Sequence, residues 1–303
     1  MIPAPLVRFF ASPYVAGDSL QKAMDVAVSL LARRRLLTTL DLLAEGITNQ
    51  ATVRQNIDTY LRMVDVAAGD PRFSDPATKP TLSLKLSSYT TEPMDHGGSG
   101  KGSREGVLEI AERARAKGVR LTLDMESRHW TDFTLETLRL LHGKGHTHVG
   151  CVIQSRLHRS EKDLDLLPPK IRTRVVIGIY REPADVALVA KPEMKERLLY
   201  LAERLLQRGH FVEFATHDET YVRRFVDGIV PKVGARPEQF EVQMLYGVPR
   251  ERLLQELVSR GIRARLYVPF ALGWGMAIAY LRRRLDEYPA MMFLVAKNTL
   301  LRG

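Results

Sequence analysis

The sequence has almost no cysteine and no long apolar run. Its single cysteine, Cys151, excludes an internal disulfide and a zinc site built from several cysteines. The surrounding Val149-Gly-Cys-Val-Ile153 has the pattern of a buried strand, so we expect a core thiol. No segment is apolar enough to span a membrane, and the start lacks the features of a secretory signal. These absences predict a cytoplasmic location.

Acidic residues are the minority among the charges, since 45 Lys and Arg face 35 Asp and Glu, a net charge of +10. Such an excess can serve nucleic-acid binding. Here the basic residues are mixed with acids, as in Glu112-Arg-Ala-Arg115 and Glu193-Met-Lys-Glu-Arg197, and no basic tail is present. We therefore expect small anionic substrates and no nucleic acid. The length of 303 residues fits either one barrel-sized domain or two smaller ones. We expect a single domain, 1–303, with residues 1–36 as an N-terminal helical extension.

Short apolar segments alternate with segments of helical periodicity. The predicted strands are Leu37–Leu43, Thr81–Leu86, Val119–Asp124, His148–Ile153, Val175–Ile179, Phe211–Ala215, Phe240–Met244 and Ala264–Val268. The predicted helices are Leu20–Arg35, Glu105–Lys117, Asp132–Gly143, Met194–Arg208 and Arg250–Gly261. Both faces of the strands look apolar, which indicates a parallel sheet covered by helices. Eight such units, without a Gly-x-Gly-x-x-Gly fingerprint, predict an α/β fold, a distorted (β/α)8 TIM-type barrel.

Two segments, Asp70–Pro80 and Thr91–Ser103, have the composition of loops. The second contains Gly97-Gly-Ser-Gly-Lys-Gly102, which lacks the spacing of a phosphate-binding loop. We expect it to be a mobile surface loop.

Polar residues follow almost every predicted strand, where a barrel carries its catalytic groups. These residues are Lys85, Asp124 with Glu126, Gln154 with Arg156, Tyr180 with Arg181, Thr216-His-Asp218, Gln243 and Tyr267. Buried charge is costly unless it is paired or used, so the pattern indicates an active site. Asp124 and Glu126 have no histidine at ligand spacing, so we expect no metal.

The segment Tyr280-Leu-Arg-Arg-Arg-Leu-Asp-Glu287 places Tyr280, Arg283, Arg284 and Glu287 on one helical face. Two adjacent guanidinium groups beside an aromatic ring suit a small carboxylate. On spacing alone, a solvated basic helix end is the simpler interpretation. The polar strand ends and the motifs that follow favour a site.

Motifs along nearly the whole chain resemble those of the proline dehydrogenase family, flavin enzymes that oxidise proline to pyrroline-5-carboxylate. In chain order they are Asp41-Leu-Leu-Ala-Glu45, Ser83-Leu-Lys-Leu86, Leu123-Asp-Met-Glu126, Gln154-Ser-Arg-Leu-His-Arg159, Gly178-Ile-Tyr-Arg-Glu-Pro183, Phe214-Ala-Thr-His-Asp218, Phe240-Glu-Val-Gln243, Arg265-Leu-Tyr-Val-Pro269 and Tyr280–Glu287. Each motif is modest alone, but their shared order is specific. The length resembles that of the small single-function bacterial members.

The resemblance implies that three cations, Lys85, Arg283 and Arg284, hold the substrate carboxylate. Asp124 would lie next to Lys85 and keep it charged and oriented. Glu45 resembles a gate carboxylate that pairs with Arg283 when the site closes. The proline ring would be enclosed by Leu245, Tyr267 and Tyr280, with Ile179 beside them. The last helix would cover the barrel mouth.

The resemblance also implies FAD as the cofactor. Arg174, near flavin N5, and Gln154 would face the isoalloxazine ring, and a cation there would stabilise the reduced flavin. The remaining contacts would come from Val176, Gly178, Tyr180, Thr216, His217 and Glu287. Hydride would leave proline C5 for flavin N5, and the electrons would pass to a quinone or another acceptor. A quinone acceptor is compatible with peripheral membrane contact.

The chain departs from the family at Ile177 and Ile179, where a lysine that anchors the flavin and a small alanine are usual. We expect weaker FAD binding and a tighter substrate pocket. Three alternatives stay open: a Schiff-base barrel lyase that uses Lys85, a non-catalytic binder of proline, and a nucleic-acid-binding protein. His217, which follows an apolar strand, is also compatible with a purely structural role.

Overall fold

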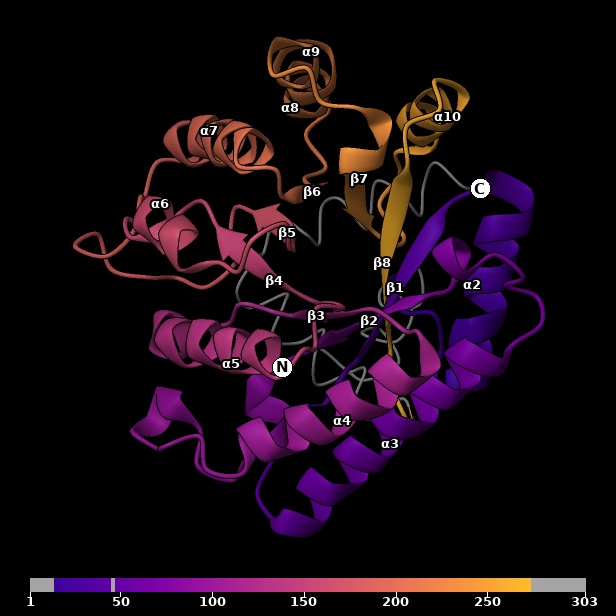
Figure 1. The fold of residues 1–303 in the computed structure, drawn as a ribbon, viewed down its shortest axis with the longest axis vertical. Coiled ribbons are helices and arrows are strands. Elements are labelled where there is room, and N and C mark those ends of the chain that lie inside the picture. The colour runs from indigo at the N-terminus through magenta and orange to yellow at the C-terminus, as the bar shows by residue number, and fades with distance from the viewer. Residues whose placement is uncertain (1–13, 45–46, 274–303) are drawn as a thin grey trace, which may run out of the picture.

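The computed structural model describes residues 14–44 and 47–273. Eight parallel strands close into a barrel in the order of the sequence, which confirms the predicted α/β fold (Figure 1). The strands are β1 (Leu37–Leu42), β2 (Thr81–Leu84), β3 (Leu121–Leu123), β4 (Val149–Gln154), β5 (Arg172–Val176), β6 (Phe211–Ala215), β7 (Phe240–Leu245) and β8 (Ala264–Phe270). Because all strands are parallel, their C-terminal ends meet at one mouth.

Helices surround the barrel (Figure 1). They are α2 (Leu20–Arg34), α3 (Gln50–Gly69), α4 (Ser103–Lys117), α5 (Thr131–Gly143), α6 (Ser160–Asp163), α7 (Lys191–Gln207), α8 (Glu219–Arg223), α9 (Val230–Lys232) and α10 (Glu251–Ser259). Caps fix several ends: Asn49 accepts a bond from the backbone N–H of Thr52 at 2.9 Å, and Gly118 ends α4 with a φ of 67°. None of the described helices is long and apolar enough to cross a bilayer.

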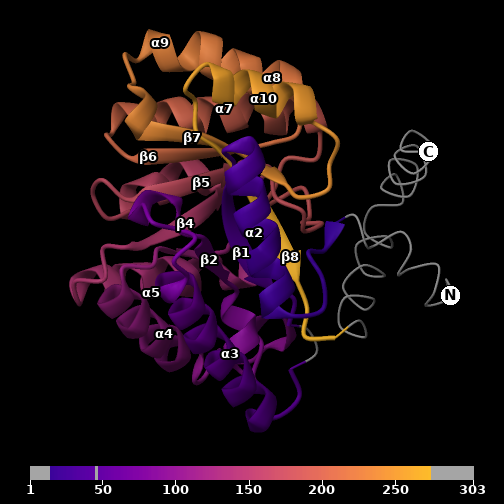
Figure 2. The ribbon, with the colours of Figure 1, turned by 90° about the vertical axis from the view of Figure 1, so that its right-hand side faces the viewer.

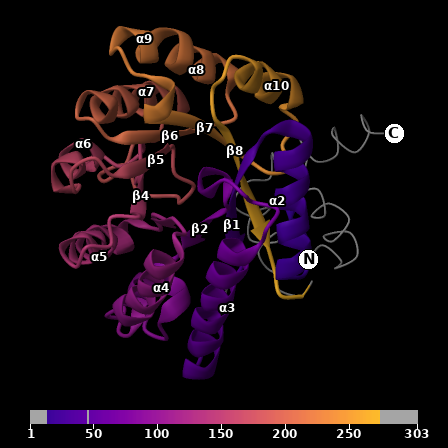
Figure 3. The ribbon, with the colours of Figure 1, turned by 45° about the vertical axis from the view of Figure 1, so that its right-hand side comes forward.

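Helix α2 lies beside β1 and β8 and fills the outer position between them (Figures 2 and 3). The chain around the start of this helix is bonded to the end of β8. The backbone N–H of Ala16 donates to Pro269 at 2.8 Å, and that of Ala271 donates to Gly17 at 3.1 Å. Helix α2 therefore covers the outside of the barrel next to β8. Strand β8 itself ends at the barrel mouth.

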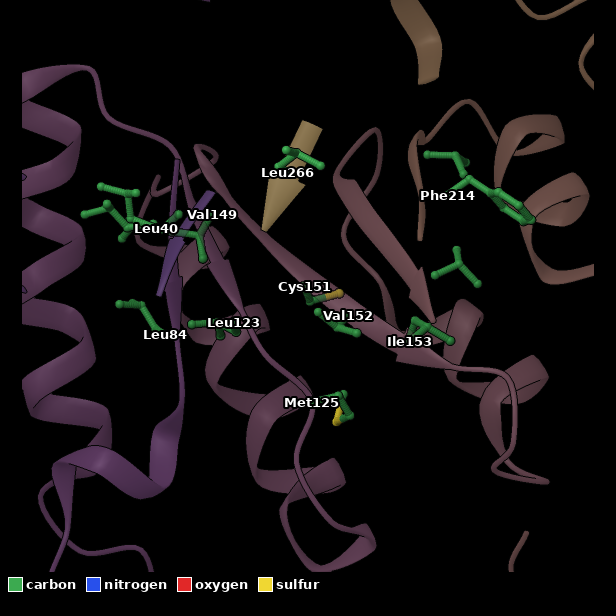
Figure 4. Packing of buried hydrophobic residues seen from close by; sticks show 14 of the residues in the cluster. Leu40, Leu84, Leu123, Met125, Val149, Cys151, Val152, Ile153, Phe214 and Leu266 are labelled. Carbon is green, nitrogen blue, oxygen red and sulfur yellow. The ribbon is translucent and has the colours of Figure 1, made fainter. Parts of the chain in front are cut away.

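The apolar core lies between the barrel wall and the helices, where leucine, valine and phenylalanine side chains of successive strands pack together (Figure 4). Cys151 is fully buried there, and burial raises the pKa of its thiol to about 12. A thiol in this setting is a poor nucleophile. The prediction of a core cysteine is confirmed.

The inner face of the barrel is polar, so the prediction of two apolar strand faces is wrong for that side. Thr39 and Thr81 share a hydrogen bond of 2.8 Å. Arg174 of β5 reaches Ser83 of β2 at 3.4 Å, and such a contact between strands that are not neighbours crosses the interior. These buried side chains are hydrogen-bonded to one another, which composition alone does not indicate.

The structure corrects two other element predictions. The fifth strand is Arg172–Val176 rather than Val175–Ile179, because Gly178 has a φ of 97° and Arg174 pairs in register with Glu213. Helix α3 was not predicted. Its buried face mixes Asn56, Thr59 and Tyr60 with aliphatic residues, which weakens the apolar period.

The glycine-rich segment is tied to its neighbours rather than free. It contains the short helix Met94–His96, and Asp95 accepts hydrogen bonds from Ser127 and, at 2.6 Å, from Trp130 Nε1. A Cβ on Gly98 would lie 2.3 Å from the backbone of Glu92, so only glycine permits this close turn. These contacts hold the loop against the segment that joins β3 to α5.

Candidate functional site

Side chains from five strands converge at the barrel mouth. Lys85 and Asp124 lie directly after β2 and β3, while Asp41, Arg174 and Tyr267 belong to β1, β5 and β8. Lys85, Asp124, Arg174 and Tyr267 were predicted site residues, and the structure brings these four together. The fifth, Asp41, was not identified as a site residue. Asp41 is the only charged residue of β1, whose other residues are leucine and threonine, and this feature of the sequence could have identified it.

Asp41 is the tight partner of Lys85. The two side chains form an ion pair in which the carboxylate is almost fully buried. Asp124 Oδ2 lies 3.8 Å from Lys85 Nζ, and the Tyr267 hydroxyl lies 3.4 Å from it. Burial raises the pKa of Asp41, and the charge of Lys85 opposes that shift. Asp124 is thus near Lys85, as expected, but Asp41 is the residue that orients it.

Asp124 instead joins Tyr267 to Arg174. Its Oδ2 accepts from the Tyr267 hydroxyl at 2.7 Å, and its Oδ1 accepts from Arg174 Nη1 at 2.8 Å. Burial and the negative charge of Asp124 raise the pKa of Tyr267, so this phenol stays protonated and donates. Burial opposes the charge of Arg174, but Asp124 and Glu213 outweigh it and raise the pKa of the guanidinium. Arg174 also lies 5.1 Å from the centre of the Tyr267 ring.

The charges of this cluster balance. Two cations, Lys85 and Arg174, face two carboxylates, Asp41 and Asp124, within the described part of the mouth. A balanced cluster is stable in a partly buried place but has no surplus positive charge for an anionic ligand. Binding of a carboxylate here would require further cations.

Further predicted site residues lie at the ends of β4 and β5. Gln154 is buried, and its Nε2 donates to the carbonyls of Met125 at 3.1 Å and Glu126 at 2.7 Å. Gly178 packs so closely that a Cβ there would lie 2.3 Å from Gln154 Oε1. The predicted contacts that flank this glycine, Val176, Ile179 and Tyr180, are half-buried.

The guanidinium of Arg174 also carries an unpaired donor. Arg174 Nη2 is buried and has no hydrogen-bond partner among residues 14–44 and 47–273. A buried N–H without a partner costs about 1–3 kcal/mol, so an acceptor beyond the described residues, such as a ligand atom, would stabilise this arrangement. An unpaired, charged guanidinium donor fits a polar atom at the edge of a flat cofactor ring such as that of FAD.

The histidine after β6 has a structural contact. His217 Nε2 accepts from the backbone N–H of Leu245 at 2.8 Å. Burial and the nearby charge of Arg250 lower the pKa of His217 to about 4, so the ring is neutral at pH 7 and can accept. Thr216 Oγ1 accepts from the backbone N–H of Asp218 at 3.2 Å. The bond to Leu245 joins a predicted cofactor residue to a predicted residue of the substrate pocket.

Five predicted site residues, Glu45, Tyr280, Arg283, Arg284 and Glu287, lie outside the described residues, as does the predicted C-terminal helix. Their roles stay predictions.

Ile177 packs on the apolar core, so its side chain contributes to the wall of the barrel.

The family comparison covers most of the chain. A family model described as proline dehydrogenase matches residues 26–177 and 191–294. The proline dehydrogenase of Deinococcus radiodurans is 36% identical over 297 residues, with 96% of this chain and 90% of the relative covered. Proline dehydrogenase 1 of Bacillus subtilis is 31% identical, with 97% and 91% covered.

Solved structures show the same fold. Proline utilization A from Bdellovibrio bacteriovorus, inactivated by N-propargylglycine, superposes with a TM-score of 0.79 at 23% identity, covering 91% of this chain and 32% of that protein. A variant of proline utilization A from Bradyrhizobium japonicum gives a TM-score of 0.71 at 21% identity, covering 91% and 30%. The chain thus spans about a third of these larger proteins, whereas it matches the small relatives over nearly their full length. With the motifs in order on a closed parallel barrel, the chain belongs to the proline dehydrogenase family.

Proposed function

We propose that this protein catalyses the FAD-dependent oxidation of L-proline to 1-pyrroline-5-carboxylate and passes the electrons to a quinone or another acceptor. The observation that carries the proposal is the mouth cluster of Lys85, Asp41, Asp124, Arg174 and Tyr267 in a chain of this family. It presents an oriented ammonium group and an oriented guanidinium group on either side of a fixed phenol.

Arg283 and Arg284 supply the charge that the described cluster lacks. They add two positive charges to a balanced set, and their forked donors suit a carboxylate. Strand β8 ends at Phe270, at the mouth, and the outer wall beside it is already covered by α2. The described chain therefore reaches residue 273 close to the mouth, which supports the assignment of the following segment as a cover, with Tyr280 and Glu287 on one predicted helical face. Glu45 follows β1 in the sequence, and β1 ends at the same mouth.

Tyr267 and Leu245 form fixed walls for the proline ring. The Tyr267 hydroxyl is held by Asp124, and the backbone of Leu245 is held by His217. Ile179 lies three residues beyond the end of β5, in the loop that leaves the strand at the mouth. Its branched side chain limits the substituents that a bound proline ring can carry.

Arg174 and Gln154 are the residues that would hold the flavin ring, with Gly178 allowing close approach and Val176, Tyr180, Thr216, His217 and Glu287 completing the cofactor site. When bound, FAD supplies the two-electron acceptor that the protein's own side chains lack. Arg174 brings a positive charge whose ionisation is maintained by Asp124 and Glu213. Such a fixed charge stabilises the electron-rich state of a cofactor beside it.

The Schiff-base alternative fits the site less well. A lysine nucleophile must be neutral, but Lys85 is in contact with one carboxylate and lies 3.8 Å from a second. Both favour the charged ammonium. Lys85 is thus arranged to bind a negative group.

A turnover assay with product trapping tests this function. The purified protein, loaded with FAD, is mixed with proline and an artificial electron-accepting dye, and pyrroline-5-carboxylate is trapped with o-aminobenzaldehyde. We expect one product per two-electron reduction of the dye. Binding of proline without dye reduction would favour a non-catalytic binder. A covalent adduct on Lys85, formed with a carbonyl compound and trapped by borohydride reduction, would favour the lyase.

A further inference from the structure

A buried ion pair lies inside the barrel beneath the mouth. Arg265 Nε donates to Glu241 Oε1 at 2.5 Å, and Arg265 Nη2 donates to Glu241 Oε2 at 3.1 Å. Both side chains are at most 2% exposed, and Arg265 Nη1 also donates to the Thr38 carbonyl at 2.7 Å. Barrel interiors are usually filled with branched apolar residues, so a forked ion pair at this place requires a reason.

Gln243 joins this ion pair to the site. Its Nε2 donates to Glu241 Oε1 at 2.6 Å, and its Oε1 accepts from Arg174 Nε at 2.8 Å. The two ends of an amide differ, so a carboxylate on one side and a guanidinium on the other permit only one orientation. Gln243 is 2% exposed, and water does not compete for these bonds. The pair Arg265 and Glu241 therefore fixes the amide that contacts Arg174.

Arg174 has a competing carboxylate on its inner side. Glu213 Oε2 lies 3.5 Å from Arg174 Nε, while the Asp124 contact on the outer side is 2.8 Å. Burial opposes ionisation of Glu213, but Arg172 and Arg174 outweigh it and lower its pKa to about 2. Without the Gln243 oxygen, Glu213 is the acceptor left for Nε. The guanidinium would then turn inward, away from Asp124 and from the mouth.

We infer that Gln243 is a positioning residue which, supported by Glu241 and Arg265, holds Arg174 so that its unpaired Nη2 faces the cofactor. The inference rests on the proposed function, because it gives that donor a flavin to contact. It assigns a function to three residues of the barrel interior that do not reach the substrate. It also explains why the polar side chains extend below the mouth instead of ending there.

The test compares Gln243→Met with Thr122→Val, both loaded with FAD. Methionine has a similar length and removes both hydrogen bonds, whereas Thr122 is a buried residue of β3 with no bond to Arg174. We expect Gln243→Met to shift the equilibrium between oxidised and reduced flavin about tenfold toward the oxidised form, which is roughly 30 mV for a two-electron couple. The kcat with proline should fall about tenfold while KM changes less than twofold. Thr122→Val should leave the flavin equilibrium, kcat and KM unchanged.

A second variant covers the case in which Gln243→Met does not fold. Gln243→Leu also removes the oxygen that accepts from Arg174 Nε but replaces it with a smaller apolar side chain, so the shift should have the same direction. If the folded Gln243 variants have the same ratio of oxidised to reduced flavin at equilibrium as the wild-type protein, the inference is overturned while the proposed function stands. A wild-type protein that takes up no FAD overturns the proposed function and this inference together.

Discussion

The ammonium of Lys85 is paired with the buried carboxylate of Asp41, and Asp124 lies 3.8 Å away because it is bonded to Arg174 and Tyr267. The two acids therefore serve different cations. Asp41 orients the group proposed to hold the substrate carboxylate, and Asp124 orients the group proposed to contact the flavin. This division makes their variants distinguishable.

Asp41→Asn should weaken proline binding more than it slows turnover. The change removes a charge-assisted hydrogen bond, which contributes about 1.5–3 kcal/mol, so KM should rise roughly ten- to a hundredfold. Steady-state kinetics of the FAD-loaded protein measure it. Asp70→Asn is the control, because Asp70 pairs with Arg72 at 2.7 Å in the connection before β2, at the other end of the barrel. A KM within twofold of wild type would exclude Asp41 as the residue that orients Lys85.

The three consecutive arginines near the C-terminus should differ in their effect. Arg283→Ala and Arg284→Ala should each raise KM for proline at least about tenfold, because each removes a forked cation from the carboxylate. Arg282→Ala, on another face of the predicted helix, is the matched control and should leave kcat/KM within twofold. Equal losses in all three variants would contradict the helical spacing.

Ile179→Ala should widen substrate acceptance. Ile179 is half-buried in the loop after β5, whereas Ile177 packs on the core. We expect wild-type protein to use 4-hydroxyproline at least about tenfold less well than proline in kcat/KM, and Ile179→Ala to narrow that ratio. Ile177→Ala should instead lower the thermal stability and leave the ratio unchanged. Comparable use of both substrates by the wild-type protein would refute this function of Ile179.

His217 should make the stability depend on pH in mildly acidic solution. Its pKa is lowered to about 4 by burial and by Arg250, while the unfolded chain titrates near ~6.5. Between these values the unfolded state binds more protons, so this contribution is complete above ~6.5 and is lost as the pH falls toward 4. Chemical unfolding at several pH values should show a loss of at most about 3 kcal/mol from this residue.

His217→Gln is the comparison for that measurement, since glutamine can accept from Leu245 but does not titrate. As the pH falls over the same range, the free energy of unfolding of His217→Gln should decrease less than that of the wild-type protein. His148, whose pKa is also lowered to about 4 by burial, titrates in both proteins, so the difference between them isolates His217. Identical pH dependence would show that folding does not lower the pKa of His217.

The barrel could be predicted from the sequence because its outer faces repeat a simple apolar pattern, and seven of the eight predicted strands agree with the observed ones to within two residues at each end. The shift of the fifth strand follows from the positive φ of Gly178, which a sequence does not display. Lys85, Asp124, Arg174 and Tyr267 were identified by position and resemblance. Asp41 was not assigned to the site, and Gln243 was noted only as a polar residue at a strand end, because their contacts depend on partners in other strands that the closed barrel brings together.

Anaerobic addition of proline to the FAD-loaded protein tests the central claim most directly. We predict a yellow protein whose flavin band near ~450 nm bleaches when proline is added and returns when an electron acceptor follows. Lys85→Met should require much more proline for the same bleaching. A colourless protein that takes up no FAD, or a flavin band that proline leaves unchanged, would contradict the claim.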